Sequence, residues 1–478
     1  MHHQPHPIAP DQVLTAAQMR DAEQRLMDAG TDVHTLMQRA GRGAAEWVWR
    51  IASGAPVTVL CGPGNNGGDG YVIAETLRER GFPVQLVAAL PPATDAAKRA
   101  ASLYSGPVVD AAEAKGTVLV DCLFGSGLNR EVTGVLRDML HELSARHHRR
   151  IAIDLPSGVA TDSGELLIDE LPHYDLCIAL GAWKPAHVLM PAMAHWRQAR
   201  LVDIGCDTEP GGARLIGRPS IAAPAADAHK YRRGLVAMVA GPMAGAALLA
   251  SRSAALGGSG YVKLLAQEPL SGAPADLVVL RAPGAMTLPQ ALSDDRIAAV
   301  LCGPGLGRDH QARERMEAAL NCGHPLVLDA DALTLLQLAD RADRTDRTGP
   351  LVLTPHEGEM AALEKSFGLS GKGTKPCRAL CLAQSAGAVV IAKGADTLVA
   401  SPGGALAYAP PSPSWLSVAG TGDVLAGLTA SRLAVTGDPF RAATEAVWLH
   451  AEAARRTGAD FTAAMLAESV RDAMCAAL

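Results

Sequence analysis

Two glycine-rich stretches place an acidic residue where a phosphate or a hydroxyl group could be bound. The first, CGPGNNGGDG (61–70), lies between an apolar run and a helical run and carries Asp69. The second, AGTGDVLAGLTA (419–430), carries Asp423 at the start of an apolar helical run. Glycines let backbone N–H groups approach a phosphate at a helix N-terminus. Both stretches therefore predict anion-binding turns, in which the carboxylate either acts on the ligand or caps the helix.

The first stretch also has the G-x-G-x-x-G spacing of a dinucleotide-binding turn, through Gly62, Gly64 and Gly67. A dehydrogenase of that type carries an acidic residue for the ribose about 20 residues further on, at the end of the second strand. Here the second strand ends in AALPPA (88–93), which contains no acid. The sequence therefore disfavours an ordinary pyridine-nucleotide dehydrogenase.

Polar residues follow three apolar runs that are typical of strands. Asn66 follows the first run, Asp121 ends the second and Asp154 ends the third, with Ser157 shortly after it. Ligands bind beyond the carboxyl ends of the strands in open parallel sheets, so we expect these residues at one edge. Oxygen ligands from Asn66, Asp121 and Ser157 would suit a hard cation such as K⁺, Na⁺ or Mg²⁺.

Apolar strands alternate with helices along the chain, which predicts α/β domains with parallel sheets covered on both faces. In the first half we expect helices at 15–29 and 32–51 and strands at 57–60, 84–89, 117–121, 150–154, 175–180 and 199–204. A Pro/Gly-rich stretch at 208–228 is typical of a domain boundary. In the second half we expect strands at 235–241, 261–266, 276–281, 298–303, 325–330, 350–355 and 388–394, then a hairpin around Pro402-Gly403-Gly404.

Composition narrows the class of protein further. The chain has 478 residues, of which 48% are hydrophobic, so it can bury large cores in two or three domains. A net charge of -6 predicts no nucleic-acid partner and no attraction to an anionic membrane. No apolar run reaches the ~20 residues of a membrane span, and MHHQPHPIAP (1–10) has no apolar signal core. We therefore expect a cytoplasmic protein.

Three motifs of the first half together resemble the NAD(P)H-hydrate epimerase family, over about residues 11–205. They are GNNGGDG (64–70), VDCLFGSGL (120–128) and AIDLPSGV (152–159). The resemblance implies interconversion of the R and S forms of hydrated NADH and NADPH, and a K⁺ ion held by Asn66, Asp121 and Ser157. It implies that the hydrate is held by Asn65, Asn66, Gly67, Gly68, Asp69, Gly125, Ser126, Gly127, Leu128, Asn129, Arg130, Glu131 and Asp154.

The chemistry of the hydrate fits a strand-end carboxylate. The hydrate is a carbinolamine at C6, beside the ring nitrogen, so inversion needs a proton moved on or off the C6 hydroxyl. Asp154 could move that proton and is the predicted catalytic residue. Lys184, in ALGAWKPAHVL (179–189), is a second candidate whose alternative reading is a solvated loop lysine.

Motifs of the second half resemble those of ribokinase-like enzymes and, more closely, the ADP-dependent NAD(P)H-hydrate dehydratase family, over about residues 215–478. Besides the GTGD core at 420–423 they are LCGPGLG (301–307), LDADAL (328–333), LTPHEGEM (353–360) and IAKGADTLV (391–399). The resemblance implies that Asp423 is the catalytic base and that ADP, with Mg²⁺, is the co-substrate. It implies hydrate contacts from Ala246, Gly307, His356 and Asp423, and nucleotide contacts from Lys393, Gly394, Ala395, Asp396, Thr397 and Gly422.

Some positions depart from the dehydratase pattern. Glu357 follows the histidine of the LTPH motif, where the family commonly has proline, and Tyr231 stands where a glycine is expected. The segment PSPSWLS (411–417) replaces a glycine-rich run. These differences could alter efficiency or nucleotide preference.

We therefore predict an α/β protein with a Rossmann-like parallel-sheet domain over 11–210 and a ribokinase-like domain over 215–478. The first would epimerise NADH and NADPH hydrates, and the second would dehydrate the S form with ADP. We expect a homo-oligomer. The alternative is a ribokinase-like small-molecule kinase with a non-catalytic N-terminal binding or dimerisation domain.

Overall fold

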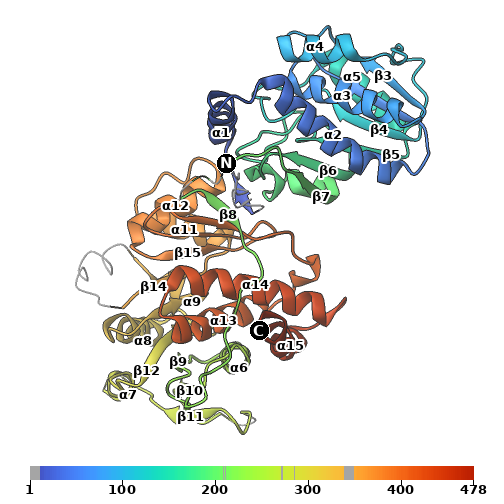
Figure 1. Ribbon diagram of the computed structural model, residues 1–478. Coiled ribbons are helices and arrows are strands. Elements are labelled where there is room, and N and C mark those ends of the chain that lie inside the picture. Colours follow the sequence, from blue (N-terminus) through green and yellow to red (C-terminus); the bar gives the residue numbers. More distant parts are fainter. Residues whose placement is uncertain (1–10, 208, 210, 271–272, 285, 338–348) are drawn as a thin grey trace. The chain divides into compact units, whose positions relative to one another are not determined.

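The computed structural model of the chain comprises two compact units, Met1–Arg214 and Leu215–Leu478 (Figure 1). It describes residues 11–207, 209, 211–270, 273–284, 286–337 and 349–478. The segment 1–10, in which we expected no signal core, lies outside the described residues. Among the described helices, none is long and apolar enough to cross a membrane.

Unit 1 is built on a parallel sheet with strand order β3-β2-β4-β5-β6-β7. The strands are β2 (Val57–Cys61), β3 (Val84–Ala88), β4 (Val118–Cys122), β5 (Arg149–Ile153), β6 (Tyr174–Leu180) and β7 (Trp196–Val202). The helices are α1 (Ala16–Asp28), α2 (Val33–Ala52), α3 (Asn65–Glu79), α4 (Asp95–Leu103) and α5 (Gly134–Arg146), with short turns η1 (Pro185–His187) and η2 (Ala192–His195). A short strand β1 (Gln12–Val13) pairs antiparallel with β8 (Ala213–Leu215).

Both faces of this sheet are covered, because side chains alternate between faces along each strand. Val57 and Val59 belong to one core, together with residues of helices α1 to α4. Leu60 belongs to a second core, which Leu140 and Leu143 of α5 complete. The strands are therefore apolar on both faces, as expected for a buried parallel sheet.

Strands β2, β4 and β5 are neighbours and run in the same direction. Their carboxyl ends lie side by side, so the loops that follow them meet at one edge of the sheet. The three polar loops noted in the sequence therefore lie at one edge, as expected for loops that follow the carboxyl ends of parallel strands.

Unit 2 contains a second sheet whose strands follow the order β17-β16-β15-β14-β13-β12-β9-β10-β11. These are β9 (Leu235–Val239), β10 (Tyr261–Ala266), β11 (Val278–Arg281), β12 (Ile297–Cys302), β13 (Leu326–Leu328), β14 (Leu351–Leu353), β15 (Val389–Ala392), β16 (Leu398–Ala400) and β17 (Leu406–Tyr408). The pairs from β11 to β15 are parallel, and β15, β16 and β17 are antiparallel, so the predicted hairpin is confirmed. The fold class is therefore α/β, as predicted.

Helices cover the second sheet, and one of them binds the carboxyl ends of three strands. They are α6 (Ala244–Leu256), α7 (Thr287–Leu292), α8 (His310–Asn321), α9 (Asp331–Leu335), α11 (Glu357–Ser366), α12 (Lys375–Ala386), η3 (Ser414–Leu416), α13 (Thr421–Thr436), α14 (Pro439–Thr457) and α15 (Ala463–Ala477). Helix α8 carries Arg315, a buried cation that donates to the carbonyl oxygens of Ala240, Leu265 and Ala282. These carbonyls lie at or just beyond the ends of β9, β10 and β11, so one side chain ties three strand ends together.

Candidate active sites

The glycine loop of unit 1 is the first two turns of a helix. Helix α3 begins at Asn65 with Gly64 as its N-cap, so Asp69 lies inside the helix. The alternative that Asp69 caps the helix is therefore wrong. The glycines are needed because backbone segments touch: a Cβ on Gly67 would lie 1.9 Å from the carbonyl oxygen of Gly62. A Cβ on Gly62 would in turn lie 1.8 Å from the carbonyl oxygen of Leu123.

Asp154 follows β5 in the left-handed backbone region, with φ 65°. A residue other than glycine pays free energy for this conformation, which is often found at functional sites. The Asp154 carboxylate is held from both sides: Lys184 Nζ lies 2.5 Å from Oδ1, and the Ser126 N–H donates to Oδ2 at 2.9 Å. Burial alone would raise the pKa of Asp154, but Lys184 outweighs it, so the pKa lies below its ordinary value.

Lys184 is buried, with 1% of its surface exposed, so the reading of a solvated loop lysine is wrong. Its ammonium group also donates to the Leu180 carbonyl at 2.6 Å. His187 supports the pair: its Nδ1 accepts the Lys184 backbone N–H, and its Nε2 donates to the Asp154 carbonyl. Burial lowers the pKa of His187 to about 4, so the ring is neutral and has this one tautomer.

Asp121 and Ser157 are in contact at the ends of β4 and β5. The Asp121 carboxylate accepts four hydrogen bonds, from Ser157 N and Oγ, the Tyr174 hydroxyl and the Leu123 N–H. Ser157 Oγ also accepts the N–H of Phe124. Burial raises the pKa of Asp121, although these hydrogen bonds favour its ionised form.

Asn66 is the third residue of the predicted cation site. Both polar atoms of its side chain are buried, and neither has a partner among the described residues. A Cβ built on Gly125 would lie 3.0 Å from Cγ of Asn66 and 3.2 Å from Oδ2 of Asp154, so these groups adjoin one loop. A buried amide oxygen without a donor fits a cation ligand, because burying an unpaired polar atom is costly.

A cavity of about 520 Å³ opens at this edge of the sheet. The predicted site residues among its walls are Asn65, Asn66, Asp69, Gly125, Ser126, Gly127, Leu128, Asn129, Arg130, Asp154 and Lys184. The predicted residues Gly67, Gly68, Asp121, Glu131 and Ser157 are not part of the wall.

Helix α1 supplies wall residues that the motifs did not indicate: Ala16, Met19, Arg20 and Glu23. Burial raises the pKa of Glu23. Burial, followed by the negative charges of Asp154 and Glu23, raises the pKa of Asp69 well above its ordinary value. Only the amphipathic period of α1 suggested that this helix packs on the domain, and nothing in it singled out Glu23.

The second site is centred on the start of α13. Its N-cap is Gly420, with φ 92°, and Asp423 is the third helical residue, so Asp423 is not the cap. The first N–H groups of a helix have no partner within the helix and are available to an anion. His450 Nε2 donates to the Thr421 carbonyl at 2.9 Å and fixes this turn, while burial lowers the pKa of His450 to about 4.

Lys393, which follows β15, brings a positive charge to the same place. A Cβ on Gly422 would lie 3.6 Å from its Nζ, which also lies 2.7 Å from Oδ1 of Asp329 and 3.7 Å from Oε2 of Glu359. Burial opposes the charge on Lys393, but Asp329 and Glu359 outweigh it and raise its pKa. Burial, then the charge of Asp329, raises the pKa of Asp423 to about 6.

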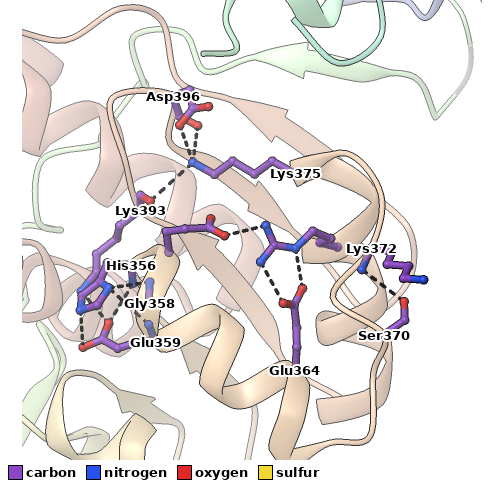
Figure 2. A network of polar contacts seen from close by, with 11 residues as sticks. His356, Gly358, Glu359, Glu364, Ser370, Lys372, Lys375, Lys393 and Asp396 are labelled. Atoms are coloured by element: carbon purple, nitrogen blue, oxygen red, sulfur yellow. Dashed lines mark hydrogen bonds and ion pairs between the residues drawn. The ribbon is translucent and has the colours of Figure 1, made fainter. Parts of the chain in front are cut away.

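His356 caps helix α11 beside this lysine. Its Nδ1 accepts the N–H groups of Gly358 and Glu359, and the Glu359 carboxylate accepts the His356 N–H (Figure 2). Because Nδ1 accepts, the ring proton is on Nε2. Glu357, which replaces the expected proline, points to Arg378 and forms an ion pair at 2.6 Å.

The predicted nucleotide loop, 393–397, is closed on itself and anchored from α12. Thr397 Oγ1 accepts the Gly394 N–H and donates to the Gly394 carbonyl. Lys375 Nζ lies 2.5 Å from Oδ1 of Asp396 and donates to the carbonyls of Asp396 and Lys393 at 3.0 and 3.5 Å (Figure 2). Lys375 therefore neutralises the one acidic residue of the loop and holds its backbone.

The loop after β12 also lies at the carboxyl edge of the sheet of unit 2. A Cβ on Gly303 would lie 1.7 Å from the carbonyl oxygen of Asp329, so the two strand ends touch through backbone. Gly307, with φ 84°, donates its N–H to Asp331 and adjoins Pro242. Pro242 lies four residues before Ala246, which is in the first turn of α6. Ala246, Gly307, His356 and Lys393 thus all follow strand ends of the same sheet.

The chain thus has two α/β units, one with a cavity lined by acidic residues and the other with a glycine-capped helix start beside Lys393. Profiles of two families match the chain: NAD(P)H-hydrate dehydratase over residues 236–475, and YjeF-related protein N-terminus over residues 33–186. The chain is 33% identical to a bifunctional NAD(P)H-hydrate repair enzyme Nnr of Synechocystis sp., over 92% of this chain and 90% of that protein. It is 36% identical to the enzyme of that name from Gloeobacter violaceus, over 92% of each.

The chain therefore belongs to the family of bifunctional NAD(P)H-hydrate repair enzymes, which confirms the resemblance seen in the motifs. Unit 1 carries the epimerase-type domain, and unit 2 carries the dehydratase domain. Among solved structures, an ADP/ATP-dependent NAD(P)H-hydrate dehydratase from Bacillus subtilis, co-crystallised with ATP and Mg²⁺, is 24% identical with a TM-score of 0.45. The match covers 54% of this chain and 95% of that one.

Proposed function

We propose that unit 1 equilibrates the R and S hydrates of NADH and NADPH, and that unit 2 uses ADP to dehydrate the S form. The observation that carries the proposal is the cavity of about 520 Å³, which gathers the predicted hydrate-binding residues of three separate motifs at one sheet edge. The residue roles proposed below are those that the family resemblance implies, and the contacts described above support them.

In unit 2, Asp423 accepts the proton of the C6 hydroxyl. The terminal phosphate of ADP transfers to that oxygen and then leaves with it, and loss of a C5 proton restores the reduced nicotinamide. The N–H groups at the start of α13 and the ammonium group of Lys393 offset the charge of the phosphate in transit. The loop 393–397 and Gly422 hold the nucleotide, while Ala246, Gly307 and His356 contact the hydrate.

Mg²⁺ would enter with the nucleotide. This ion is usually held by phosphates and only one or two carboxylates. Within the described part of the chain, no group of three or more His, Cys, Asp or Glu residues is placed to hold a metal. When bound, Mg²⁺ would neutralise phosphate charge.

A K⁺ ion in unit 1 fits the donors found there. The unpartnered, buried amide of Asn66 supports it most directly, and the ionised form of Asp121 would supply a balancing charge beside Ser157. The role of the ion would be to fix the three loops on which the hydrate rests.

We also propose a homo-oligomer that works in the cytoplasm, where NADH and NADPH are used and their hydrates form. An exposed Trp49 on α2, 41% exposed and covered on one side by Arg80, supports a subunit contact. The partners of the protein would be the two hydrates and the adenine nucleotide. It would bind neither nucleic acid nor a membrane.

The experiment is incubation of the full chain with mixed R and S hydrates, with and without ADP, while the absorbance of reduced nicotinamide is followed. We expect complete conversion of both epimers, but only with ADP. The kinase alternative predicts that the nucleotide is consumed and a stable phosphorylated product accumulates. That result, or conversion of the S form alone, would contradict the proposal.

A further inference from the structure

The cavity of unit 1 contains three acidic residues, and they differ in how they are held. Asp154, Asp69 and Glu23 come from the end of β5, the second turn of α3 and helix α1. Both oxygens of Asp154 are engaged, one by the Lys184 ammonium group and one by a backbone N–H. Because the lysine stabilises the ionised form, Asp154 is a weak base and a poor proton donor at neutral pH.

Asp69 and Glu23 are held differently. Within the part of the chain that the structure describes, no hydrogen bond or ion pair engages either side chain. Asp69 is 8% exposed, and the surface that it does expose faces the cavity. The charged groups around the two carboxyls are Asp154, Lys184 and Arg20, and burial raises the pKa of each carboxyl. Both carboxyl groups can therefore hold or release a proton where Asp154 cannot.

We propose that Asp69 and Glu23 are the two proton-exchanging residues of the epimerase site, each acting on one face of the nicotinamide ring, while Asp154 remains ionised throughout. This inference rests on the proposed function of unit 1. It replaces Asp154 as the proton carrier and assigns it to charge stabilisation.

The reaction balances as follows. The carboxyl group of Asp69 gives its proton to the C6 hydroxyl, the C6–O bond breaks and water leaves. The lone pair of the ring nitrogen forms a C6=N1 double bond, so the ring carries a positive charge that Asp154 stabilises. A water molecule then attacks C6 from the other face, and its surplus proton passes to the carboxylate of Glu23. The reverse reaction uses Glu23 as donor and Asp69 as acceptor.

Inversion explains why two residues from different elements are required. Water must leave one face of a planar ring and arrive on the other, and a single carboxyl cannot reach both faces. The same logic places two carboxyl groups on opposite sides of the sugar in inverting glycosidases. In unit 1 one carboxyl comes from the second turn of α3 and the other from α1.

The test uses the full chain with pure R or S hydrate in water labelled with oxygen-18, without ADP. In the wild type, each inversion should place a solvent oxygen at C6. Asp69→Asn and Glu23→Gln should each slow inversion by about 10²- to 10⁴-fold, the usual effect of removing a positioned acid or base. Each variant keeps one carboxyl and should still exchange the hydroxyl oxygen of one epimer without inverting it, with opposite epimers for the two variants.

Exposed Asp21 on the same helix provides the control Asp21→Asn, which should match the wild type. Dehydration of the S hydrate, measured on each variant, confirms that unit 2 is intact, and an unchanged melting temperature of unit 1 confirms that unit 1 is folded. The inference is overturned if inversion proceeds without label, if either variant inverts at the normal rate, or if either variant loses exchange on both epimers. A wild-type chain that dehydrates but never inverts would instead overturn the proposed function of unit 1.

Discussion

Asp154 is a buried carboxyl group and Asp423 a half-buried one, and the pKa of the first is lowered whereas that of the second is raised. Asp154 has a lysine at 2.5 Å, which favours its charge. Asp423 has Asp329 nearby, and Lys393 offsets that repulsion only in part. A carboxyl with a pKa near the working pH is suited to exchange protons, while a carboxyl paired with lysine is suited to remain an anion. The pair therefore illustrates two different uses of the same side chain.

Asp423→Asn tests the role of the base. The change is nearly isosteric, so the variant should fold and bind ADP normally, but it cannot take the proton of the hydroxyl. Dehydration of the S hydrate should fall by about 10²- to 10⁴-fold. Interconversion of the epimers, measured on the same protein, serves as the control. A near-normal rate of dehydration would leave Asp423 without a catalytic role.

The pH dependence of dehydration follows from the same group. Because burial raises the pKa of Asp423 to about 6, the residue is a carboxylate above that pH and is protonated below it. A general base must be deprotonated, so kcat/KM for dehydration should be level above about pH 7 and fall about tenfold per unit below pH 6. The measurement is kcat/KM from pH 5 to 8 with saturating ADP. A rate that is flat down to pH 5 would contradict the assignment.

At the scale of elements, strand positions could be predicted but the beginnings of functional helices could not. Every predicted strand lies within three residues of the observed bounds, because apolar runs between breakers are a local signal. The helical run expected after the glycine stretch 61–70 is helix α3, which begins inside that stretch at Asn65. Glycines disfavour a helix on their own, and here close backbone contacts with Gly62 outweigh that preference.

The candidate sites likewise contain residues that the sequence could predict and residues that it could not. Motif residues such as Asp154 and Lys393 are at the strand ends where the pattern placed them. Glu23 was missed because its place in the cavity depends on how α1 packs, and packing partners distant in sequence leave no local signature. Lys375 was missed for the same reason, since it reaches the nucleotide loop from another helix.

Lys375→Met tests whether α12 positions the nucleotide loop. The variant loses the ion pair with Asp396 and two hydrogen bonds to loop carbonyls, so helix α12 no longer anchors the loop through this side chain. We expect KM for ADP to rise by roughly tenfold or more, with a smaller change in kcat, since a charge-assisted hydrogen bond contributes about 1.5–3 kcal/mol. The ADP-induced rise in melting temperature should shrink accordingly.

The matched control is Lys372→Met, three residues earlier and exposed. It should leave KM and the ADP-induced shift unchanged. Lys375→Arg keeps the charge and should recover part of the affinity. If Lys375→Met changes only kcat, or nothing, the loop does not depend on this lysine.

At the scale of the whole molecule, each compact unit contains its own sheet, cores and candidate site. The two reactions should therefore be separable by substitution within one chain. In this family the two reactions are consecutive. Unit 1 converts the R hydrate, which unit 2 does not accept, into the S hydrate that unit 2 dehydrates.

Asp121→Ala tests this separation. It leaves buried donors of Ser157, Tyr174 and Leu123 without an acceptor, and each unsatisfied group costs about 1–3 kcal/mol. We expect epimer interconversion to slow and unit 1 to melt at a lower temperature, while dehydration of the S hydrate stays normal. The control is Asp138→Ala, an exposed residue of α5. Equal loss of both activities would show that the units depend on each other.

Gly62 in unit 1 and Gly303 in unit 2 have a shared consequence for how such a chain can vary. Each follows a strand, and at each an added methyl group would lie 1.8 or 1.7 Å from the carbonyl oxygen of the neighbouring strand end. Neighbouring side chains cannot make room, because the obstacle is main chain. Even alanine, the smallest step away from glycine, would separate the two strand ends on which a pocket is built. We therefore expect glycine at both positions in any related chain that keeps these strand ends in contact, whatever side chains its pocket carries.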